Sequence, residues 1–322
     1  MTFGSQRGFS SPRDWSVNTW LIVICIAVFV LNSLMPPSLI MTGEVEYFSE
    51  DARQIPKSEL AIGVKSDGKR RPYWSTAELP VLWESPDGII PVGTQEVVVQ
   101  GFLLKWGYFS TAKALVSYSP TWGLTGFEFW RFITFQFLHA NLTHLLFNMI
   151  GLFFFGSIVE QFLGKKRYLA FYLLCGIAGA CMYLLLNSLG MVVKELTDKE
   201  WVPFLLFDDK HTILVGASAG VFGVIMAAAF LMPEVKVLLF FVIPMKLKTL
   251  AYGLVAVALL SVFFSKQVAN AGGEAAHIGG AVAGFFFVRK PHFLHGFFDF
   301  LGRVAPTSRP IQRSVTRLTH HF

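Results

Sequence analysis

Charged side chains are scarce in this sequence: Asp, Glu, Lys and Arg make up 15% of its 322 residues, whereas 53% are hydrophobic. A composition this poor in charge argues against a water-soluble globular protein. Several stretches of about 18 or more residues carry no charge, and each is long enough to cross about 30 Å of hydrocarbon as a helix. The sequence therefore predicts an all-α polytopic membrane protein that contacts the lipid bilayer.

Cysteine is also rare. The chain has 3 cysteines (Cys25, Cys175 and Cys181), and all of them lie in apolar stretches, so no disulfide framework is expected. No small-x-small cleavage site follows the first apolar stretch, which favours a membrane span there over a cleaved signal peptide. No mitochondrial-type leader is evident, and we expect the plasma (inner) membrane of a bacterium.

The net charge of +6 is distributed unevenly along the chain. Lys and Arg gather in alternate segments between the apolar stretches, around 7–13, 165–167, 236–248 and 289–317, whereas acids are prominent in the other segments. By the positive-inside rule, this pattern places both termini in the cytoplasm. The basic balance is therefore a topological signal and no indication of a nucleic-acid partner.

Six spans are expected, at about 17–35, 132–159, 168–193, 212–232, 249–264 and 275–288. The chain then divides into a cytoplasmic N-terminus with the first span (1–40), an extended first external loop with a polar insertion (41–125), a core with the other spans (126–290) and a basic cytoplasmic tail (291–322). Within the insertion, Gln95 to Leu104 is apolar enough for a strand or two.

Polar side chains inside apolar spans are costly in lipid and need a reason. They occur in three places: His139, His144 and Asn148 in "HANLTHLLFN", Ser218 in "LVGASAGVFG", and His277 in "EAAHIGGAVAG". His144 and Asn148 are four residues apart and so share one face of a helix. Ser218 lies about 9 Å into its span at about 1.5 Å per residue. The polar groups therefore converge on one depth, open to the outer face.

These groups are the ones that acyl transfer requires. A serine hydroxyl becomes a good nucleophile when an imidazole takes its proton, and a tetrahedral intermediate needs donors for its oxyanion. His144, Asn148 and the backbone N–H of Ser218 are candidates for those donors. Glu274 is the nearest acid to His277 and is expected to face the loop. A Ser218–His277 dyad is therefore favoured over a triad.

Small residues flank the candidate serine and histidine. Gly216 and Gly220 frame Ser218, and Gly280 and Gly284 follow His277 at the same spacing. This spacing is typical of closely packed membrane helices. Close packing of the fourth and sixth spans would bring the hydroxyl and the imidazole within hydrogen-bonding distance.

Four motifs together resemble the rhomboid family of intramembrane serine proteases. They occur in order between about Gly126 and Arg289: "EFWR", "HANLTHLLFN", "GASAGVFG" and "AHIGG". A small-x-Ser-small run alone is common, but all four motifs in this order are highly specific. The resemblance implies a six-helix bundle, with 126–290 as its catalytic core.

The resemblance also implies roles for individual residues. Ser218 would be the nucleophile and His277 its general base, while His144 and Asn148 would help to form the oxyanion hole. Gly216 would give room for the substrate backbone. The implied reaction is hydrolysis of a peptide bond in or near a transmembrane helix of another membrane protein, with no cofactor and no metal.

Other positions would support this site. Phe222 matches an aromatic residue that packs against the catalytic imidazole, and Trp130 and Arg131 match a structural pair in the first external loop. His139 is expected near the outer mouth in a structural role. Ala219 departs from the family, because relatives commonly place glycine directly after the serine.

Two other functions stay open. A transporter or channel would show internal repeats and polar residues across the full membrane depth, and the sequence shows neither. A catalytically inactive relative that binds membrane proteins would typically lack the serine or the histidine, and this chain has both. Taken singly, Ser218 suits helix packing and His277 suits a buried structural histidine; only their joint occurrence favours the protease.

Overall fold

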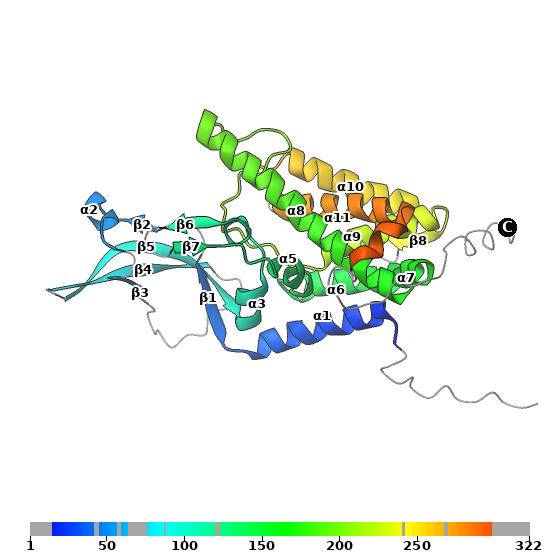
Figure 1. Ribbon diagram of the computed structural model, residues 1–322, viewed down its shortest axis with the longest axis horizontal. Helices are drawn as coiled ribbons and strands as arrows, with labels where there is room; N and C mark the ends of the chain where they lie inside the picture. The colour runs from blue at the N-terminus through cyan, green and yellow to red at the C-terminus, as the bar shows by residue number, and fades with distance from the viewer. Residues whose placement is uncertain are drawn as a thin grey trace, which may run out of the picture.

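The computed structural model describes residues 15–41, 45–56, 59–63, 76–86, 88–119, 123–239, 242–266 and 270–297. Most of the tail expected at 291–322 lies outside these residues. Figure 1 shows a helical bundle with a β-sheet beyond one end of its helices.

The bundle is built from apolar helices. These are α1 (Val17–Leu34), α6 (Leu142–Gly151), α7 (Ser157–Leu163), α8 (Lys165–Thr197), α9 (Ser218–Leu231), α10 (Leu247–Phe263) and α11 (Ala271–Arg289). A π-helical turn (Leu152–Gly156) joins α6 to α7. Helix α11 packs against α8, α9 and α10. Helix α9 contacts α6, α7, α8, α10 and α11, and most of its residues are buried, so α9 is the central helix of the core.

Four helical segments of the described residues are long and apolar enough to cross a membrane: Val17–Leu34, Leu142–Leu163, Lys165–Thr197 and Ala271–Arg289. The chain is therefore a multi-pass membrane protein. Two further apolar helices, Ser218–Leu231 and Leu247–Phe263, are shorter, and the count of six is not confirmed. The fourth span was expected from residue 212, but the chain is extended up to Gly216, and α9 begins only at Ser218.

A β-sheet in the segment expected to form the first external loop corrects the all-α prediction. Its strands are β1 (Pro37–Met41), β2 (Glu46–Tyr47), β3 (Leu60–Ile62), β4 (Thr76–Ser85) and β5 (Gly88–Gly101). The order is β1-β5-β4-β3, with β2 also paired to β5, and every pairing is antiparallel. Buried Val81 and Val92 pack with Ala52 of α2 (Glu50–Arg53). Of the stretch 95–104 expected to hold a strand or two, residues 95–101 form the second half of β5, and residues 102–104 begin a helix.

Shorter elements connect these parts. They are α3 (Phe102–Gly107), α4 (Thr111–Ala114), the hairpin β6–β7 (Ser117–Ser119, Gly123–Thr125), α5 (Arg131–Thr134), 3-10 turns at Phe135–Phe137 and Pro291–Leu294, and the hairpin β8–β9 (Lys236–Leu239, Ile243–Lys246). The second span was expected from residue 132, but residues 131–137 form short turns, and α6 begins at Leu142.

A buried carboxylate attaches α1 to the rest of the bundle. The backbone N–H groups of Val17 and Asn18 donate to Glu160, both at 2.9 Å. The Asn18 amide donates to the Leu152 carbonyl at 2.8 Å, and the Tyr168 hydroxyl donates to the Asn18 Oδ1 at 2.7 Å. N–H groups at a helix start have no partner within the helix and favour a negative charge. Glu160 therefore satisfies the start of α1 while its own charge is compensated.

Candidate functional site

The segment before Ser218 is held by backbone hydrogen bonds. Leu214 exchanges both of its backbone hydrogen bonds with Phe109, at 3.0 and 2.8 Å, and the Gly216 N–H donates to the Phe135 carbonyl at 3.0 Å. Gly216 has a φ of 134°, a conformation that side chains other than hydrogen rarely adopt. This turn ends the extended segment and places Ser218 as the first residue of α9.

His144 and Ser218 both lie against Gly216. A Cβ at position 216 would be 2.7 Å from His144 Cε1, 2.8 Å from His144 Nε2 and 3.4 Å from Ser218 Oγ. A side chain at this position would therefore fill the space beside the hydroxyl and the His144 ring. Glycine leaves that space open.

Ser218 and His277 meet across two helices. The Ser218 Oγ lies 2.8 Å from the His277 Nε2, so α9 and α11 bring together two residues 59 positions apart. Phe222, one turn after Ser218, stacks on the His277 ring with 4.1 Å between ring centroids and an interplanar angle of 10°. The imidazole is thus fixed by a ring on its face and a hydroxyl at its edge.

Close packing of the helix backbones makes this contact geometrically possible. A Cβ at Gly280 would lie 2.0 Å from the carbonyl oxygen of Ala219, the residue that follows the serine. Cβ atoms do not approach backbone atoms that closely, so only glycine fits at this crossing. The proximity of α9 and α11 that the small residues predict is confirmed.

His277 has a second polar neighbour. Its Nδ1 lies 2.9 Å from the Oε2 of Glu274, and the two side chains are 14% and 23% exposed. The expectation that Glu274 faces the loop is wrong. The only signal in the sequence was the spacing of three residues, which places both side chains on one face of α11.

The other polar residues of the second span lie on α6 or just before it. The Asn148 side chain donates to the His144 carbonyl at 2.8 Å, so its amide is turned along its own helix. His139 is 3% exposed, and its ring lies edge to face with that of His144 at 5.3 Å between centroids. His144 thus lies beside Ser218, whereas His139 lies behind His144.

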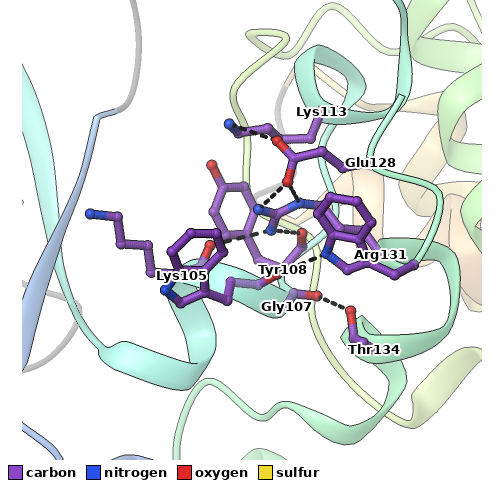
Figure 2. Close-up of polar contacts among 9 residues, drawn as sticks. Lys105, Gly107, Tyr108, Lys113, Glu128, Arg131 and Thr134 are labelled. Atoms are coloured by element: carbon purple, nitrogen blue, oxygen red, sulfur yellow. Dashed lines mark hydrogen bonds and ion pairs between the residues drawn. The ribbon is translucent and has the colours of Figure 1, made fainter. Parts of the chain in front are cut away.

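Arg131 belongs to a separate polar cluster around α5 (Figure 2). The Arg131 guanidinium contacts Glu128 Oε2 at 2.6 Å, donates to the Tyr108 carbonyl at 2.6 Å and lies 4.7 Å from the centroid of the Tyr108 ring. Lys113 approaches Glu128 from the other side at 3.0 Å. The Trp130 Nε1 donates to the Trp106 carbonyl at 3.3 Å. These contacts fasten the loop before α5 and do not reach Ser218.

The contacts of Glu128 with Lys113 and Arg131 predict that the stability of the protein depends on pH. Burial raises the pKa of Glu128, but hydrogen bonds from Lys113 and Arg131 outweigh it, and the pKa is lowered overall. A carboxyl whose pKa is lower in the folded than in the unfolded state contributes stability above the unfolded value of about 4.3. That contribution is lost as the pH falls through the folded pKa.

We therefore expect the melting temperature of the wild type to fall more steeply below about pH 4 than that of a Glu128→Gln variant, which should already be less stable at pH 7. Thermal unfolding in detergent across the acid range measures both curves. Parallel curves would show that the cluster contributes nothing to acid sensitivity.

Chemically, the arrangement of Ser218 and His277 suits proton transfer from a hydroxyl to an imidazole, which is the first step of nucleophilic catalysis by serine. Within the described ranges, no group of three or more His, Cys, Asp or Glu side chains is placed to hold a metal ion.

Comparison with known proteins places this site in a family context. A family model described as Rhomboid domain matches residues 126–290. The chain is 33% identical over 181 residues to Rhomboid protease AarA of Providencia stuartii, covering 53% of this chain and 60% of the relative. It is 34% identical over 141 residues to Putative rhomboid protease YdcA of Bacillus subtilis, covering 42% and 59%.

A plant relative is also similar: RHOMBOID-like protein 12, mitochondrial, of Arabidopsis thaliana is 30% identical over 149 residues, covering 46% of this chain and 42% of the relative. The chain matches about three fifths of the length of the two bacterial relatives. Because relatives occur in bacteria and in a plant, the comparisons do not select the bacterial inner membrane expected from the sequence.

Proposed function

The chain belongs to the rhomboid family, and from this premise we propose that it is an intramembrane serine endopeptidase that hydrolyses peptide bonds in or near transmembrane helices of other membrane proteins. The observation that carries the proposal is the 2.8 Å contact between the Ser218 Oγ and the His277 Nε2. Relatives named as rhomboid proteases support the same activity.

In the proposed reaction, the Ser218 Oγ attacks the scissile carbonyl carbon while its proton passes to the His277 Nε2. Collapse of the tetrahedral intermediate breaks the C–N bond, and the imidazolium gives its proton to the leaving amine. Water then attacks the acyl-enzyme, with His277 again taking the proton and returning it to Ser218. The stacked Phe222 ring keeps the imidazole edge directed at the hydroxyl throughout.

The oxyanion needs donors beside Ser218. The first N–H groups of α9 have no partner within the helix, and the partial positive charge of a helix start favours an anion. The His144 ring lies across the open face of Gly216 and is the side-chain donor closest to this position. Asn148 has to release the His144 carbonyl before its amide can join them.

Membrane placement follows from the same helices. We assign six spans: the four long segments together with α9 and α10, which have 14 and 17 residues. At about 1.5 Å per residue α9 is about 21 Å long, which is shorter than the hydrocarbon core of about 30 Å. We therefore place the start of α9, and with it Ser218 as its first residue, below one lipid surface. Substrate helices then reach the site from the lipid, and they must unwind locally, because an intact helix does not expose its carbonyls to attack.

An inactive relative that only binds membrane proteins is the second candidate, and the formed Ser218–His277 contact favours the enzyme over it.

The test compares purified wild type with Ser218→Ala in detergent or liposomes, using a generic transmembrane substrate and a serine-reactive fluorophosphonate. We expect Ser218→Ala to lose cleavage by at least about 10⁴-fold and to lose labelling entirely. Ser33→Ala is a matched control, because Ser33 is an exposed serine on α1 whose hydroxyl donates to the Phe29 carbonyl. Cleavage by Ser218→Ala at the wild-type rate would refute the proposal.

A further inference from the structure

Glu274 has no part in a Ser218–His277 dyad, yet it contacts the imidazole directly. It lies in the first turn of α11, where its backbone N–H donates to the Asn270 carbonyl at 3.2 Å. Its Oε2 lies 2.9 Å from the His277 Nδ1, on the opposite side of the ring from the serine hydroxyl. Negative charge is favoured in the first turn of a helix, so this position suits an ionised carboxylate.

The carboxylate decides which ring nitrogen carries the proton. An ionised carboxylate only accepts hydrogen bonds, so the His277 Nδ1 must donate to it, and the neutral ring then has its lone pair on Nε2. That lone pair faces the Ser218 hydroxyl, which is the arrangement that a general base requires. The opposite tautomer would place two acceptors against each other at Nδ1.

We propose that Glu274 is a positioning residue that holds His277 in its Nδ1–H tautomer and stabilises the imidazolium formed when Ser218 gives up its proton. The inference rests on the proposed protease function and extends it from a dyad to a Ser218–His277–Glu274 relay. Glu274 transfers no proton in this scheme. One proton passes from the Ser218 Oγ to the His277 Nε2 and on to the leaving amine, and in deacylation another passes from water through the His277 Nε2 back to Ser218. Its partial exposure limits the strength of the ion pair but leaves the hydrogen bond intact.

The other groups around the imidazole do not perform this role. From α9 come the Ser218 hydroxyl at Nε2 and the Phe222 ring on the face. From α6 comes the His144 ring, which lies against Gly216 beside Ser218. Among the printed contacts of the imidazole within the described residues, the Glu274 carboxylate is the one acidic partner.

The test measures kcat and KM for Glu274→Gln. We expect kcat to fall about 10²-fold with little change in KM, because the carboxylate acts on the imidazole and does not contact the substrate. Glu200→Gln is the matched control: it removes an exposed external carboxylate that pairs with Lys266 and does not contact His277.

A second variant distinguishes the positioning role from a loss of folding or a merely structural role. Glu274→Ala leaves a space at a partly exposed position, so added formate is expected to restore its rate in a saturable manner, whereas chloride at equal ionic strength is not. A Glu274→Gln variant with the wild-type kcat and KM overturns the inference and leaves the protease function standing. A rate loss in Glu274→Ala with no formate rescue overturns it as well. If Ser218→Ala itself stays active, the proposed function fails first.

Discussion

Replacing His277 with alanine is expected to lower kcat/KM by at least about 10⁴-fold, and adding Ser218→Ala to it is expected to cause almost no further loss. The reason lies in the 2.8 Å contact between the Ser218 Oγ and the His277 Nε2. A serine without its base keeps its proton, and a base without its serine has no nucleophile to activate, so each change removes the same step. Steady-state cleavage of one transmembrane substrate by the wild type, both single variants and the double variant measures this non-additivity.

A suitable control is His211→Ala. His211 lies in the loop between α8 and α9, where its N–H donates to Asp209 Oδ1, and we expect its replacement to leave kcat/KM within about twofold. If the losses of the two single variants instead multiplied in the double variant, Ser218 and His277 would act independently. The proposed proton transfer between them would then be wrong.

The meeting of Ser218, His144 and His277 could be expected from the sequence because membrane helices impose strict rules. Polar groups in lipid are costly, so their depth along each span is informative, and small residues mark the faces that pack. In the structure, Ser218 lies against His277 and His144 lies against Gly216, as these rules predict. Their catalytic roles remain predictions.

The sheet and the Glu274 contact were harder to infer, for two different reasons. The strands β4 and β5 pair over ten positions, but alternation in a mixed polar stretch does not reveal which strands pair. Glu274 lies within one turn of His277, and spacing alone places it on the same face without deciding whether it points to the ring or to the loop. In the structure it contacts Nδ1, the ring edge that the stacked Phe222 and the Ser218 hydroxyl leave available.

The close spacing of α9 and α11 keeps Ser218 within reach of His277. Gly280→Ala is expected to lower kcat by about 10²-fold or more and to reduce the melting temperature clearly, because the new methyl group would lie 2.0 Å from the Ala219 carbonyl oxygen. Backbone atoms cannot rotate away as a side chain can, so α9 and α11 must separate. A displacement of about 1 Å between reacting groups costs on the order of 10²-fold in rate.

The chain offers a matched control for this change. Gly253 lies in α10, and a Cβ added there would meet nothing within 4 Å. Gly253→Ala therefore adds the same methyl group to an apolar helix without a clash, and it gains up to about 1 kcal/mol of helix propensity. We expect wild-type turnover and an equal or higher melting temperature for Gly253→Ala, measured beside Gly280→Ala in the same detergent. Equal behaviour of the two variants would show that α9 and α11 leave room for a methyl group between them. Their close crossing would then not be what holds Ser218 against His277.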